Sequence, residues 1–102
     1  MAGQSHRGHE PTPDQGVYGI SVAAELSGAP IQSIRLWERH NLLSPARTEG
    51  GTRRYSADDL IRIARIVALV AAGVNIAGIV RILELEDSNT ALRAERSSGQ
   101  SP

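Results

Sequence analysis

Residues 21–41, with the sequence SVAAELSGAPIQSIRLWERHN, combine two short helical patterns with a turn between them. Its first part has apolar residues at helical spacing and predicts a helix over residues 21–27. Ser21 can cap this helix by accepting a hydrogen bond from a first-turn amide, and Gly28 supplies the left-handed residue that ends it.

The second part of the stretch predicts a helix over residues 31–40, closed by Asn41, which tolerates a positive φ. Ile34 and Trp37 would face the first helix, so Trp37 is interpreted as a packing anchor. Two short helices around a glycine-containing turn, the second with a polar outer face, are typical of a helix-turn-helix.

A polar segment with three arginines follows the second helix: residues 46–55 have the sequence ARTEGGTRRY. The Gly50-Gly51 pair between two extended-compatible runs predicts a β-hairpin with a two-residue turn. Because this hairpin offers almost nothing apolar to a core, it is interpreted as a projecting wing.

A third helix begins with a clear signature. Ser56 is the predicted N-cap, Asp59 completes a capping box, and Tyr55 packs with Leu60 as a hydrophobic staple. The helix is predicted to run to Ala72 and is apolar on nearly all sides in its second half. Its predicted core face consists of Leu60, Ile63, Ala64, Val67, Val70 and Ala71.

A fourth helix is predicted after Gly73, with Asn75 as its cap. Its apolar stripe consists of Ile76, Ile79, Val80 and Leu83. The stripe is expected to stop near Leu85, where acidic residues accumulate, and residues 89–96 would form two turns of a marginal helix.

These elements define a mainly α fold, a winged helix-turn-helix of four helices and a two-stranded wing. Residues 1–16 are rich in polar residues, glycine and proline and are expected to be a disordered tail. The DNA-binding domain is placed at residues 17–86. A short marginal helix and a flexible tail would occupy residues 87–102.

Composition excludes several classes of function. The 102 residues contain no Cys, which excludes disulfides and thiolate metal sites. His6 and His9 lack further ligands, so no metal is expected. No catalytic constellation is present, and the chain is predicted to be neither an enzyme nor dependent on a cofactor. No apolar run is long enough to span a membrane, and a cytoplasmic location is expected.

The charge is distributed unevenly although the formal net charge is zero. Every basic side chain apart from the histidines is an arginine, and residues 31–65 hold seven arginines against four acidic residues. The rest of the chain is correspondingly acidic. A neutral protein can still present one basic face, which is what binding to a phosphate backbone requires.

The order of elements resembles the N-terminal domain of the MerR family of transcription regulators. The resemblance covers about seventy residues and rests on four segments with the sequences ISVAAELSG (20–28), IRLWER (34–39), LLSPAR (42–47) and GGTRRYS (50–56). A fifth segment, GVNIAGI (73–79), is most similar to the HspR-like branch, heat-shock repressors whose targets include chaperone operons. Two departures are Asn41, where the family usually has Gly, and the near absence of the long C-terminal coil.

The resemblance implies a homodimer on an inverted repeat of double-stranded DNA, with a recognition helix in each major groove and wings on the flanking backbone. Arg35 would be the principal base reader, and the wing arginines would hold phosphates. Glu38 would steady the recognition helix by pairing with an arginine of that helix. The implied DNA-binding residues are Gln32, Ser33, Arg35, Leu36, Arg39, Arg47, Thr48, Arg53, Arg54, Tyr55 and Asn75.

The function predicted from these features is sequence-specific DNA binding, as a repressor of stress-response genes in the bacterial nucleoid. Another regulator or a chaperone protein would be a further partner. Two alternatives remain open. One is an excisionase-like or architectural DNA-binding factor, which uses the same small winged fold. The other is a protein-interaction module that pairs with a longer MerR-type regulator and modulates it.

Overall fold

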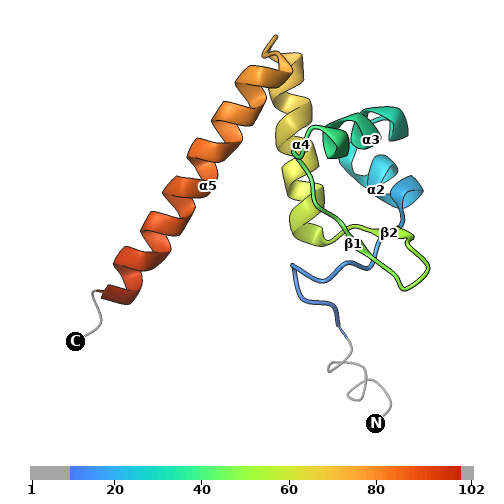
Figure 1. The fold of residues 1–102 in the computed structure, drawn as a ribbon, viewed down its shortest axis with the longest axis horizontal. Coiled ribbons are helices and arrows are strands. Elements are labelled where there is room, and N and C mark those ends of the chain that lie inside the picture. The colour runs from blue at the N-terminus through green and yellow to red at the C-terminus, as the bar shows by residue number, and fades with distance from the viewer. Residues whose placement is uncertain (1–9, 100–102) are drawn as a thin grey trace. The chain divides into compact units, whose positions relative to one another are not determined.

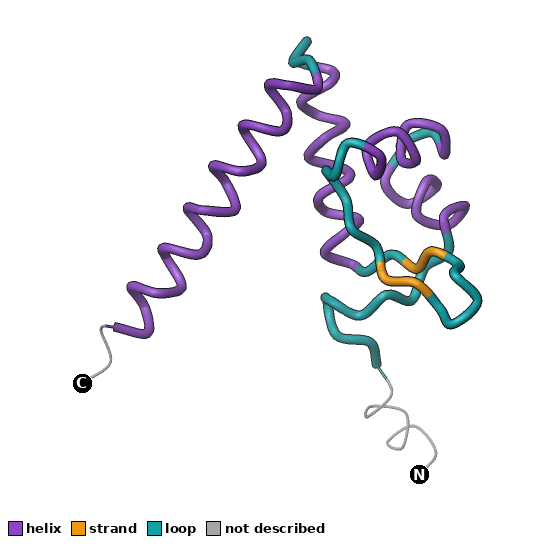
Figure 2. Tube along the Cα trace, in the orientation of Figure 1, coloured by secondary structure: helices purple, strands orange, loops and turns teal. Residues whose placement is uncertain are grey.

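The computed structural model describes residues 10–99, which contain four helices and one two-stranded antiparallel sheet. Figure 1 shows their order along the chain, and Figure 2 shows the helices, strands and loops. The chain divides into two compact units, one up to Val67 and the other from Ala68 onward. The predicted winged helix-turn-helix with four helices and a small wing is confirmed.

Helix α2 (Ile20–Ser27) is the first helix of the helix-turn-helix. It begins one residue earlier than predicted: Gly19 is the N-cap, no side chain caps the helix, and the predicted Ser21 cap is therefore wrong. The C-terminal prediction is confirmed, because Gly28 has φ 78° and its amide donates to the Ala24 carbonyl. The first turn of α2 thus has amides that no side chain of the helix satisfies.

Helix α3 (Ile31–Arg39) follows with Pro30 as its N-cap and buries Ile34 and Trp37. It ends in a left-handed turn at Asn41, which has φ 61°. The Asn41 amide donates to the Glu38 carbonyl at 3.0 Å, and the Leu42 amide donates to the Trp37 carbonyl at 2.9 Å. This pattern is a Schellman motif with Asn in the position that glycine usually occupies.

Strands β1 (Ala46–Arg47) and β2 (Arg53–Arg54) form the wing, with Arg47 opposite Arg53. The turn differs from the predicted two-residue loop. The Thr48 amide donates to the Thr52 carbonyl and the Gly51 amide to the Thr48 carbonyl, both at 2.9 Å, and Gly51 has φ 85°. Only Gly51 takes the left-handed conformation, which is typical of a three-residue hairpin loop ending in a bulge.

Residues 10–16, part of the predicted disordered tail, lead up to the wing, where Gly16 lies beside β2. The Asp58 amide donates to the Pro13 carbonyl at 2.9 Å, which connects this segment to the first turn of the helix that follows the wing. Gly16 lies so close to the wing that a Cβ there would be 2.8 Å from the Arg54 carbonyl oxygen. The remaining residues of the predicted tail, 1–9, lie outside the described part of the chain.

Helix α4 (Ala57–Ala71) begins with the predicted capping box. The Asp59 amide donates to the Ser56 hydroxyl, and the Ser56 amide donates to the Asp59 carboxylate, both at 2.9 Å. The predicted core face is only partly correct. Ile63, Ile66 and Leu69 are buried, Leu60 and Val67 are half-buried, and Ala64, Val70 and Ala71 are exposed.

Helix α5 (Ile76–Gly99) lies in the second unit and is one continuous helix of 24 residues. Asn75 caps it as predicted, since the Gly78 amide donates to its side-chain oxygen at 2.8 Å. Ile79 and Leu83 are buried, in agreement with the predicted stripe. The marginal two-turn helix predicted for residues 89–96 is instead part of α5, because residues 91–96 have the sequence ALRAER, whose intrinsic helix propensity is high.

Candidate nucleic-acid interface

Helix α3 separates its apolar and polar residues onto different faces. Ile34 and Trp37 lie in the core of the first unit, and Ser33 and Leu36 are half-buried. The side chains that the structure leaves exposed are Gln32, Arg35 and Arg39. An exposed helix face with two guanidinium groups and an amide carries the donors and acceptors that recognise base edges in a major groove.

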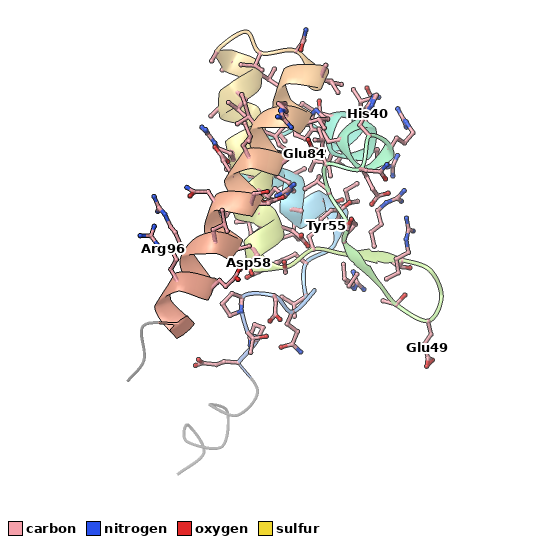
Figure 3. All side chains as sticks on the ribbon, turned by 60° about the vertical axis from the view of Figure 1, so that its left-hand side comes forward. His40, Glu49, Tyr55, Asp58, Glu84 and Arg96 are labelled. Carbon is pink, nitrogen blue, oxygen red and sulfur yellow. The ribbon has the colours of Figure 1, made fainter. Side chains whose placement is uncertain are left out.

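The wing carries arginines of differing exposure next to this helix. Arg47 is exposed, whereas Arg53 and Arg54 are half-buried, and Thr48 lies exposed at the start of the turn. Figure 1 shows the hairpin projecting from the first unit, and Figure 3 shows Glu49 pointing away at its tip. The structure thus brings ten of the eleven predicted DNA-binding residues into the first unit.

The eleventh residue, Asn75, belongs to the second unit. Its side chain accepts a hydrogen bond from the Gly78 amide, so it caps the start of α5. This local role accounts for Asn75 without any ligand. Its predicted contribution to DNA binding stays a prediction.

Glu38 connects α3 to the wing. Its carboxylate accepts two hydrogen bonds from Arg53 Nε, at 2.6 and 2.9 Å, and one from Arg47 Nη2 at 3.3 Å. Arg47 also donates from Nη1 to the Gly51 carbonyl at 3.0 Å. The predicted pairing of Glu38 with Arg35 or Arg39 is replaced by an ion-pair network with the wing, and Glu38 raises the pKa of Arg53.

Tyr55 is a core residue rather than a surface contact. Its side chain is fully buried, and its hydroxyl has no hydrogen-bond partner among the described residues. Burial and the nearby Glu38 carboxylate both raise the pKa of this phenol. Its hydroxyl is therefore not exposed to a DNA phosphate in this structure, and its DNA contact stays a prediction.

Arg54 lies against the start of α2. A Cβ at Gly19 would be 3.2 Å from Arg54 Nη1, so the guanidinium fits here because residue 19 has no side chain. The N-terminus of a helix carries a partial positive charge and unpaired amides. The guanidinium and the uncapped α2 N-terminus together create a locally positive surface.

Arg62 of α4 supports the end of α3. Its Nε donates to the Leu42 carbonyl at 2.6 Å, directly after the Schellman turn. The sequence patterns predicted no role for this arginine. A twenty-residue separation between donor and acceptor leaves no local pattern from which this contact is predictable.

Residues 10–99 contain no cluster of three or more His, Cys, Asp or Glu side chains that suits a metal ion. Within the same range, none of the helices has the length and apolar character needed to cross a membrane. His6 and His9, considered above as metal ligands, lie outside the described residues.

Comparisons with known proteins agree with this geometry. Residues 18–86 match the model of the MerR helix-turn-helix regulatory protein family. A Streptomyces coelicolor protein named "Putative heat shock protein HspR" is 45% identical over 95 residues, which are 92% of this chain and 63% of that protein. The regulator GlnR of Bacillus anthracis is 34% identical over 74 residues, 72% of this chain and 57% of GlnR.

A solved structure has the same arrangement of elements. The crystal structure of HiNmlR, a MerR family regulator lacking the sensor domain and bound to promoter DNA, has a TM-score of 0.67 and 28% sequence identity. The match covers 79% of this chain and 62% of HiNmlR. This chain spans less than two thirds of the length of each protein named here. The matched segment includes the helix-turn-helix and wing, and the chain belongs to the MerR family of transcription regulators, not to an enzyme family.

Proposed function

We propose that this chain is a sequence-specific regulator that binds double-stranded DNA through α3 and the wing. The observation that carries the proposal is the exposed polar face of α3, with Gln32, Arg35 and Arg39, in the same compact unit as the wing arginines. Arg35 is the preferred base reader, since a guanidinium matches the two major-groove acceptors of guanine.

The wing and the start of α2 supply contacts to the DNA backbone in this proposal. Arg54 and the uncapped amides of α2 are adjacent and both attract anions, so one phosphate can be held by both. Arg47 and Arg53 add two further guanidinium groups. Contacts of this kind fix the position of a protein on the duplex and carry no sequence information by themselves.

The proposed regulator acts as a homodimer on an inverted repeat, with α5 as the pairing element. Leu85 and Leu92 are 55% and 57% exposed and lie seven residues apart, hence on one face of the helix. An antiparallel second copy places Leu85 opposite the partner's Leu92 and Glu84 opposite the partner's Arg93. This arrangement covers two exposed leucines and pairs opposite charges.

The proposed regulatory role is repression of stress-response genes. Its support is the 45% identity to the Streptomyces coelicolor protein named as an HspR heat shock protein. A repressor needs no chemistry of its own, because occupancy of an operator is enough to block transcription. The bound DNA, rather than any cofactor, is the expected ligand of the interface.

The test begins with a pool of random duplexes enriched by repeated binding to the purified chain. Enrichment of a common inverted repeat is expected, followed by a steep loss of affinity with salt. The slope of log affinity against log salt should be roughly −0.9 for each phosphate contact. Failure to enrich any sequence, or an affinity insensitive to salt, would overturn the proposal.

A further inference from the structure

The carboxylate of Glu38 is unusual among the charges of the interface because it is largely covered. Its side chain is 13% exposed, whereas the arginines that it binds, Arg53 and Arg47, are 33% and 48% exposed. A negative charge beside a surface that binds phosphates opposes that binding electrostatically. Its presence there requires a contribution that outweighs this repulsion.

The geometry indicates what that contribution is. Glu38 lies on α3, whereas Arg53 and Arg47 lie on opposite strands of the wing. Both oxygens of the carboxylate bind Arg53 Nε, and the contacts recorded among the described residues leave the two terminal nitrogens of Arg53 without a protein partner. The planar guanidinium is therefore held at one edge while its outer nitrogens stay available for a phosphate.

Arg47 extends the same connection to the tip of the hairpin. One of its terminal nitrogens donates to Glu38 and the other to the Gly51 carbonyl in the turn. A single carboxylate on α3 is thus linked to β1, to β2 and, through Arg47, to the turn between them. No apolar core holds these two-residue strands, since Ala46 and Arg47 are exposed and Arg53 and Arg54 are half-buried.

We propose that Glu38 is a positioning residue that fixes the wing relative to the recognition helix and thereby increases the discrimination of specific from non-specific DNA. This inference rests on the DNA-binding function proposed above. A wing in a fixed position relative to α3 contacts the DNA backbone only where α3 also meets its preferred bases. A wing released from α3 adapts to any duplex, because phosphates occur on every sequence.

The proposal predicts changes of opposite sign in the affinity for two kinds of DNA. Glu38→Gln removes a negative charge near the phosphates, which by electrostatics alone strengthens binding to every duplex. Loss of positioning instead weakens binding to the preferred duplex only. Glu49→Gln is the matched control, because Glu49 is an exposed acidic residue at the tip of the same hairpin. The substitution removes the same charge but leaves the contacts of Glu38 with Arg53 and Arg47 in place.

The first experiment needs no DNA. NMR on the full chain follows solvent exchange of the Arg53 Nε proton and of the Thr48 amide, which is bonded across the hairpin. Both protons are expected to exchange about tenfold faster in Glu38→Gln, because the wing opens more often, and at the original rate in Glu49→Gln. Unchanged exchange in Glu38→Gln would overturn the proposal whether or not the chain binds DNA.

The second experiment measures affinity for the enriched duplex and for a scrambled duplex of equal length. Glu38→Gln is expected to lower the affinity for the enriched duplex about tenfold and to raise the affinity for the scrambled duplex slightly. Glu49→Gln is expected to change both affinities equally. If Glu38→Gln also changes both equally, positioning is excluded. If the wild-type chain enriches no duplex, the proposed function fails, and the exchange experiment still decides whether Glu38 holds the wing.

A second variant keeps the test decisive if Glu38→Gln lowers the helical circular-dichroism signal. Arg53→Lys retains the charge of the wing but removes the Nε that meets both carboxylate oxygens. Arg53→Lys is expected to lower the affinity for the enriched duplex about tenfold and to keep the affinity for the scrambled duplex within about twofold of the wild-type value. Equal losses on both duplexes would show that Arg53 acts only as a phosphate contact and would overturn the positioning role.

Discussion

Two arginines of the interface, Arg35 and Arg54, are expected to act on DNA in different ways. Arg35 is exposed on α3, the proposed base-reading helix, so Arg35→Ala should weaken binding to the preferred site by about 1–3 kcal/mol and relax the preference at one base pair. Arg54 lies beside the α2 N-terminus, so Arg54→Ala should lower the affinity for all DNA sequences alike. It should also reduce the slope of log affinity against log salt by about one. Fluorescence anisotropy on single-base variants of the site measures both. Identical profiles would contradict the division into base readers and phosphate contacts.

The buried hydroxyl of Tyr55 gives a second expectation for a single residue. Because this hydroxyl has no partner among the described residues, Tyr55→Phe should leave stability at neutral pH unchanged or slightly raised. The raised pKa means that the folded state disfavours the phenolate. The stability that depends on neutral Tyr55 is therefore complete below pH about 10 and decreases as pH rises through the folded pKa.

Urea unfolding at pH 7 and at pH 11 measures the difference. Tyr55→Phe should lose less stability between the two pH values than the wild-type chain does. Its DNA affinity at pH 7 should match that of the wild type. A clear loss of affinity would show that the hydroxyl reaches a phosphate after a rearrangement, contrary to its burial here.

Among the elements, α4 depends on the capping box that joins it to the wing. Ser56 is buried and exchanges hydrogen bonds with Asp59, so Ser56→Ala should lower the free energy of unfolding by about 1 kcal/mol. Ser44→Ala is a matched control, because Ser44 is an exposed loop residue. Urea denaturation of both variants measures the effect, and equal midpoints would contradict a stabilising role for the cap.

The elements also show which features sequence patterns determine. The capping box of α4 and the glycines that end α2 and α4 were predictable, since each depends on residues close together in the sequence. The buried face of α4 was not, because a helix that is apolar on nearly all sides has no unique stripe: Ile66 and Leu69 are buried, whereas the predicted Val70 is exposed. The length of α5 was missed because charged residues with good helix propensity sustain a helix that has no apolar pattern.

The interface shows a similar limit. The predicted polar outer face of α3 is confirmed for Arg35 and Arg39, which are exposed. The sequence patterns did not locate the partner of Glu38, because Arg53 lies fifteen residues away and meets it only when the wing folds back on α3. The same reasoning applies to Tyr55, since a tyrosine after two arginines is compatible with both a phosphate contact and a core anchor.

At the scale of the whole molecule, pairing of two chains through α5 is the property most open to test. Replacing Leu85 and Leu92 together by Ser should convert a dimer into a monomer in light scattering. Affinity for the inverted repeat should fall more than about tenfold, because the second half-site then gains nothing from the first. Ile61→Ser is the control, since Ile61 is an exposed apolar residue of the first unit. A wild-type chain that is monomeric with and without DNA would contradict the pairing.

The chain segment before α2 has one more consequence. Arg54 of β2 pairs with Ala46 of β1. Because backbone hydrogen-bonding groups alternate between the two sides of a strand, the amide and carbonyl of Tyr55 point to the opposite edge of β2. Tyr18 pairs with Tyr55 at that edge. The Tyr55 amide donates to the Tyr18 carbonyl at 2.7 Å. An open strand edge invites pairing with other chains and aggregation. The segment occupies that edge, so a projecting hairpin without a core of its own is protected from unwanted self-association at high concentration.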